Sequence, residues 1–124
     1  MPDPSRRAWL LGLTCLALAA ACTPHVQYRT ELAACDPRTD VRSCAGNCLE
    51  ERDEYLLGFV ELDDQGWLWD RRQLTTLLDE LAEAGAREDL LMVVFVHGWK
   101  HNASVCDTNV ACLREVLLRL DDIE

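Results

Sequence analysis

Residues 90–103, which read LLMVVFVHGWKHNA, are the strongest indication of fold in the sequence. Residues 90–96 are apolar at every position and rich in valine, without the alternation of a strand that has one wet face. Such a run is typical of a strand that is covered on both faces of a parallel sheet. We therefore expect an α/β fold in which residues 90–96 form the buried central strand, and a chain that turns sharply at His97 and Gly98.

The position of this turn is informative about function. In open α/β sheets, ligands bind beyond the carboxyl ends of the strands, which is where His97, Gly98 and Trp99 follow. A glycine lets the backbone bend tightly and approach a ligand, so that the next backbone N–H can point at a developing negative oxygen. The sequence thus predicts an oxyanion-type turn at Gly98 and Trp99.

This arrangement resembles the α/β-hydrolase superfamily, in which an apolar third strand commonly ends in His-Gly and an oxyanion residue, as residues 93–99 do here. The longer stretch 95–103, with Asp107 and Asn109 ahead of a helix, is similar to a bacterial and fungal branch of that superfamily. At the level of topology the resemblance covers roughly residues 55–120. It implies a serine hydrolase of the esterase, lipase or related acyl-hydrolase kind, which needs no cofactor.

The resemblance also assigns roles to the residues of the turn. The backbone N–H of Trp99 becomes one oxyanion-hole donor, and Gly98 permits the bend. His97 braces the loop through side-chain hydrogen bonds and is not the general base, because no nucleophile is near it in sequence.

The catalytic triad of that family is not complete in this sequence. Ser5, Ser43 and Ser104 lack glycines at the spacing of a nucleophile elbow, and no histidine follows His101. We therefore expect the N-terminal part of an exported serine hydrolase that is inactive alone and meets its ester or acyl substrate only within the full-length protein. The alternative is a small, non-catalytic lipoprotein that serves as a binding or assembly module.

The elements around the strand follow from turn and helix signals. Residues 55–62 are predicted to be a strand, residues 63–66 a turn, and residues 67–69 a short returning strand, which gives a β-hairpin. A helix should follow from Asp70, with Gln73 completing a capping box and Gly85 as the stop. Its buried stripe consists of Leu74, Leu77, Leu78 and Leu81.

A second amphipathic helix is predicted after the turn. Its apolar positions are Leu113, Val116, Leu117 and Leu120, and Asp107, Thr108 and Asn109 are all available to cap it. The predicted order is therefore hairpin, helix, buried parallel strand, helix. These elements make residues 53–124 the N-terminal part of an α/β-hydrolase-like domain.

Residues 1–21 have the layout of a secretory signal peptide, with Arg6 and Arg7 before an apolar run. The two arginines resemble a twin-arginine signal, and Sec export is equally compatible. Residues 18–22 resemble a bacterial lipobox, which makes Cys22 the expected lipidation site; simple cleavage after residues 19–21 is the alternative. Both place the mature chain in the periplasm or cell envelope.

Residues 22–52 are predicted to be an irregular, cysteine-containing leader, because prolines, glycine and polar residues follow no sustained period. Export makes disulfides the expected state of the cysteines, and Cys106 with Cys112 is the favoured local pair. A zinc site from Cys35, Cys44, Cys48 and His25 is disfavoured by its loose spacing, so that no metal is expected. The five disulfide candidates are Cys35, Cys44, Cys48, Cys106 and Cys112.

The charge of the chain excludes some partners. With a formal net charge of -10 over 124 residues, it lacks the clustered Lys and Arg that nucleic acids require. A membrane partner is expected only through a lipid anchor at Cys22. The carboxylates at Glu50, Glu51, Asp53 and Glu54 are interpreted as a solvated face.

Overall fold

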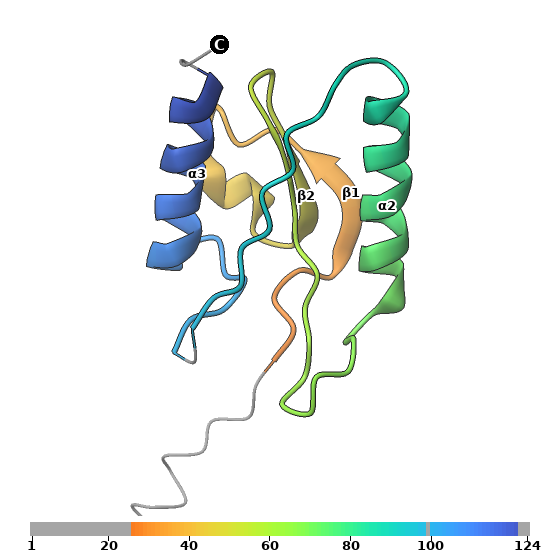
Figure 1. Ribbon diagram of the computed structural model, residues 1–124. Helices are drawn as coiled ribbons and strands as arrows, with labels where there is room; N and C mark the ends of the chain where they lie inside the picture. The colour runs from red at the N-terminus through yellow and green to blue at the C-terminus, as the bar shows by residue number, and fades with distance from the viewer. Residues whose placement is uncertain (1–25, 99, 122–124) are drawn as a thin grey trace, which may run out of the picture.

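We describe a computed structural model of the chain, in which residues 26–98 and 100–121 are described. These residues form a small mixed α/β unit with a three-stranded sheet and two α-helices, which lie on either side of the sheet in Figure 1. In chain order the elements are β1 (Glu31–Cys35), η1 (Val41–Cys44), β2 (Asn47–Glu51), β3 (Leu56–Gly58), α2 (Arg71–Gly85) and α3 (Thr108–Asp121). The α/β class predicted from the sequence is confirmed in this coarse form.

The sheet has the order β1-β2-β3, with β1 parallel and β3 antiparallel to the central β2. In the register of β2 and β3, Leu49 lies opposite Gly58. The prediction of an irregular leader is therefore wrong for residues 26–52, which supply two of the three strands. β1 is largely exposed, so its residues do not show the alternation of apolar and polar side chains that predicts a strand. It is a strand because its backbone pairs with β2.

One disulfide, between Cys35 and Cys44, holds β1 to the end of η1 with a Cα–Cα distance of 5.6 Å. The prediction of disulfides is confirmed for this pair. Cys48 is a buried thiol, while Cys106 and Cys112 are exposed and not bonded to each other, so the favoured local pair is wrong. The reason is that α3 starts at Thr108, which leaves Cys106 in the preceding loop and carries Cys112 about one turn into the helix.

Reduction of this disulfide should lower the free energy of unfolding by about 2–4 kcal/mol, because the cross-link restricts the unfolded chain. The measurement is urea unfolding with and without a thiol reductant. The double variant Cys35→Ala/Cys44→Ala is the control, since its unfolding should not respond to reductant. An unchanged midpoint for the wild-type chain under reduction contradicts the expectation.

The hairpin predicted over residues 55–69 forms, but with fewer paired residues than predicted. The turn is as expected: the N–H of Gly66 donates to the carbonyl oxygen of Asp63 at 3.0 Å, and Gly66 has a φ of 83° that favours glycine. The returning strand shrinks to a single antiparallel bridge between Leu62 and Leu68. The regular pairing of β3 is instead with β2, where Leu57 is buried.

Helix α2 begins and ends close to its predicted limits. Asp70 is its N-cap, and its carboxylate accepts a hydrogen bond from the N–H of Arg72 at 2.9 Å. The predicted capping box is wrong, because the side chain of Gln73 turns into the protein and binds Arg29 and Glu61. Leu77 packs so closely over Gly58 that a Cβ atom there would collide with it, whereas Leu78 is exposed.

The predicted central strand is not paired in the structure. Residues 90–96 have no strand neighbour among the described residues, and the chain runs as an open coil from the end of α2 back towards the loop before α3 (Figure 1). The prediction that this segment is buried is wrong for the described chain: Leu91 is 75%, Val94 77% and Val96 85% exposed. Among the described residues the only pairings in the sheet are β1 with β2 and β2 with β3, and neither outer strand pairs with residues 90–96.

The second predicted helix is confirmed as α3, which packs beside the sheet. Its Val110 joins Leu57, Phe59 and Ala103 in the core, and Leu113 and Leu117 pack against that cluster. Val116, in contrast, is about half exposed. Among the described residues, neither α2 nor α3 has the length and hydrophobicity of a membrane-spanning helix.

Candidate functional site

The turn that follows residues 90–96 is tight and open to solvent. The carbonyl oxygen of Gly98 accepts a hydrogen bond from the N–H of His101 at 3.1 Å, which closes a β-turn. The Nδ1 atom of His97 lies 3.1 Å from the same oxygen, a contact that the tautomer with a proton on Nδ1 satisfies. This is the kind of contact that bracing by His97 requires. Trp99 lies outside the described residues, so its role as an oxyanion donor stays a prediction.

Asp107 organises the loop that follows this turn. Its carboxylate accepts hydrogen bonds from the backbone N–H groups of Asn109 at 2.8 Å and Asn102 at 3.2 Å, and lies 3.2 Å from Nδ1 of His101. Of the three residues that could cap the second helix, Asp107 is therefore the one that does so. Burial alone would raise the pKa of Asp107, but the two N–H donors and His101 outweigh it and hold that pKa below its usual range.

Asp107 should therefore contribute stability that depends on pH. Because its folded pKa lies below the unfolded value, the contribution is present above the unfolded pKa and is lost as the pH falls through the folded one. Replacing Asp107 by Asn should cost about 0.5–1 kcal/mol at pH 7, since a negative charge at a helix N-terminus is favourable. The gap between variant and wild type should close as the pH is lowered below about 4.

The measurement is urea unfolding of both proteins across this pH range, with Asp64→Asn in the exposed hairpin turn as the matched control. The control should stay within about 0.5 kcal/mol of the wild type. A constant difference between Asp107→Asn and the wild type at pH 7 and pH 3 contradicts the assignment.

The buried side of the same loop is held by two arginines. Nε of Arg29 donates to the carbonyl oxygen of Ala103 at 2.6 Å, and Nη1 of Arg114 donates to that of Val105 at 3.3 Å. Between them lies Glu50, which forms ion pairs with both guanidinium groups. The prediction that Glu50 belongs to a solvated face is therefore wrong, because its side chain is fully buried.

Arg29 is also the centre of a wider polar network. The carboxylate of Glu61 accepts from the backbone N–H groups of Tyr28 at 2.8 Å and Arg29 at 2.7 Å. Gln73 accepts from the N–H of Glu61 at 2.9 Å and donates to the carbonyl oxygen of Arg29. The guanidinium lies 3.8 Å from the centre of the Phe59 ring. Burial lowers the pKa of Arg29 below its usual value, and Glu50 opposes that shift.

None of these network residues was identified from the sequence. Arg29 and Ala103 are 74 residues apart, and Glu50 and Arg114 are 64 apart, so no local spacing relates them. The available signal was weak: Glu61 interrupts an apolar strand, and Gln73 occupies the inward face of an otherwise leucine-rich helix.

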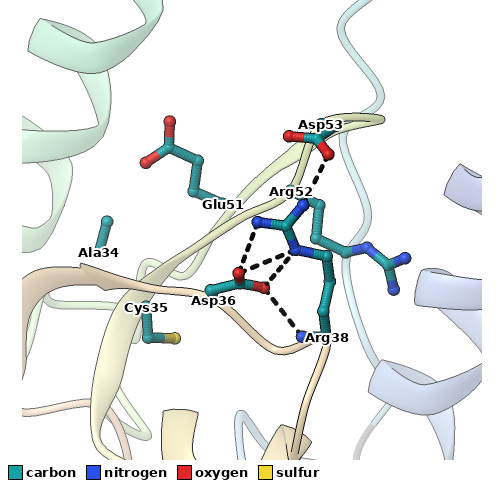
Figure 2. Close-up of a pocket in the computed structure, with 7 residues that line it drawn as sticks. All are labelled: Ala34, Cys35, Asp36, Arg38, Glu51, Arg52 and Asp53. Carbon is teal, nitrogen blue, oxygen red and sulfur yellow. Dashed lines mark hydrogen bonds and ion pairs between the residues drawn. The ribbon is translucent and has the colours of Figure 1, made fainter.

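A shallow hollow of about 240 Å³ lies elsewhere, over β1 and the end of β2 (Figure 2). Its charged side chains are in part paired with one another: Arg38 forms ion pairs with Asp36 at 2.7 Å and with Asp53 at 2.6 Å. All three side chains are exposed. Pairs of this kind are typical of solvated surfaces, and we assign the hollow no function.

The described residues contain the turn but not a nucleophile with its base. Ser104 accepts a hydrogen bond from the N–H of Cys106, and the ring nitrogens of the two described histidines are bonded only to Gly98 and Asp107. Burial raises the pKa of the Cys48 thiol, which keeps it protonated and unreactive. No cluster of metal-ligating side chains occurs among the described residues.

Comparison of the chain with protein-family models, curated proteins and solved structures gives no match.

Proposed function

We propose that this chain is the N-terminal part of an exported serine acyl hydrolase of the esterase or lipase kind, to which it contributes a central strand and an oxyanion-type turn. One observation carries the proposal. Residues 90–96 are apolar throughout, are largely exposed and pair with no strand among the described residues, and they lead directly into the closed turn at Gly98.

The exposure of this segment indicates what it needs. Side chains on both faces are exposed, from 46% at Leu90 to 85% at Val96. Covering a large apolar side chain contributes about 1.5–3 kcal/mol, so leaving the whole segment open forgoes a large stabilisation. A surface strand would alternate with polar residues, and this one does not. Parallel strands on its edges, with helices on both faces, are the arrangement that satisfies it.

In the proposed enzyme the work is divided between this chain and the remainder of the domain. The backbone N–H of Trp99 stabilises the oxyanion that forms when the acyl carbonyl is attacked, and Gly98 and His97 shape the turn. The serine nucleophile, its histidine and its acid come from outside this chain. The ester or acyl substrate binds only when both parts are present, and no cofactor takes part.

We further propose that the protein is exported and held at the membrane by a lipid on Cys22, which lies outside the described residues. The disulfide between Cys35 and Cys44 supports export, because oxidising compartments preserve such bonds.

A second function is favoured by the absence of a nucleophile and base pair among the described residues. The chain would then be a non-catalytic lipoprotein, and the open segment 90–96 would serve as its assembly surface. The two functions differ in whether an ester is ever hydrolysed.

A chromogenic short-chain ester assay separates them. The chain alone and a version lengthened through the coding sequence after residue 124 are compared at equal concentration. We expect turnover only in the lengthened protein, and its loss when the elbow serine is replaced by alanine. No turnover in either protein, with both of them folded, would leave the assembly module as the better account.

A further inference from the structure

The loop at residues 101–107 is clamped at two backbone carbonyl groups. Arg29 binds the carbonyl oxygen of Ala103 through Nε, and Arg114 binds that of Val105 through Nη1. Ala103 and Val105 are themselves buried, whereas His101 between the turn and the clamp is part-exposed. The loop is therefore anchored on its buried side, and the turn before it is exposed to solvent.

Glu50 fixes the two arginines relative to each other. Nε and Nη2 of Arg114 each lie 2.7 Å from a different carboxylate oxygen, which is the two-pronged geometry that a guanidinium fork favours. Nη1 of Arg29 lies 3.0 Å from Oε1 of the same carboxylate. We call Arg29, Glu50 and Arg114 the buried triad. It links the residues before β1, where Arg29 lies, to β2 and α3.

Arg29 is in turn held in place by the sheet. Its Nη1 also donates to the carbonyl oxygens of Cys44 at 2.6 Å and Asn47 at 3.0 Å. Apolar side chains of similar volume would fill this space with less loss of hydration, because burying charges is costly. Apolar side chains, however, have no hydrogen-bond donors, so they could not bind these carbonyl oxygens.

From this geometry we infer that the buried triad positions the loop 101–107 and, through it, the turn that ends at His101. The inference rests on the proposed function, in which that turn supplies the oxyanion donor. Arg29, Glu50 and Arg114 do not touch the substrate, so they are positioning residues. Asp107 holds the loop from its other end, at the start of α3.

The test compares Arg114→Lys with Arg114→Met in the full chain, by amide hydrogen exchange and by the NMR signals of the His101 ring. Lysine keeps the charge beside Glu50 but lacks the fork that reaches Glu50 and Val105 together. The matched control is Arg119→Met, because Arg119 lies in the last turn of α3 and is exposed. Far-UV circular dichroism shows whether each variant is folded.

We expect the amides of His101, Asn102 and Asp107 to exchange about tenfold faster in Arg114→Lys relative to the amides of α2, and the His101 ring signals to shift. The control should leave both unchanged. If Arg114→Met does not fold, Arg114→Lys alone decides the test. Wild-type loop exchange and ring signals in Arg114→Lys overturn the inference, because charge alone then suffices. The measurement needs no substrate, so failure of the ester assay leaves its result standing.

Discussion

Replacing Glu50 by glutamine is expected to lower the free energy of unfolding by about 3–5 kcal/mol, since it leaves a buried charge without its partner. Glutamine has nearly the shape of glutamate but no charge, so Arg29 and Arg114 would face each other without compensation. Proteins are stable by only about 5–15 kcal/mol, so the variant should lose a large part of its free energy of unfolding. Urea unfolding followed by circular dichroism measures the change.

The neighbouring residue provides a matched control. Glu51→Gln is the same substitution one position along β2, where the side chain is exposed. Its free energy of unfolding should stay within about 0.5 kcal/mol of the wild type. Equal effects of Glu50→Gln and Glu51→Gln would show that the buried triad does not contribute as we describe.

Local patterns in the sequence predicted the parts of the fold that depend on neighbouring residues. The cap at Asp70, the turn closed by Gly66 and the amphipathic helix after Asp107 were all predicted and are present. Each is decided within a few residues, by a side chain that binds a nearby N–H or by a glycine with a positive φ. These are short-range interactions, which sequence patterns record.

The parts that sequence reasoning missed depend on distant pairing. β1 owes its order to β2 and to the disulfide, and Glu50 is buried only because Arg29 and Arg114 reach it from remote segments. Residues 90–96 show the opposite outcome. Their apolar pattern predicts a strand with neighbours on both edges, but no described strand pairs with them. Of the candidate site, the turn at Gly98 was predicted, whereas the residues that anchor its loop were not.

In the proposed enzyme, the substitution Trp99→Pro should lower kcat about 10²–10³-fold, which is the usual effect of removing one oxyanion-hole donor. Proline has no backbone N–H, so the change removes the donor itself. Trp99→Leu is the matched control: it removes the indole but keeps the N–H. A role for the indole in binding would appear in KM in both variants, whereas the donor acts on kcat.

The most direct test of the account is therefore the kcat for a chromogenic short-chain ester, measured in the lengthened protein with Trp99→Pro and with Trp99→Leu. We expect a loss of about 10²–10³-fold in kcat for Trp99→Pro and a kcat close to wild type for Trp99→Leu. Equal kcat values in the two folded variants would contradict this expectation, because the backbone N–H at residue 99 would then have no part in stabilising the oxyanion.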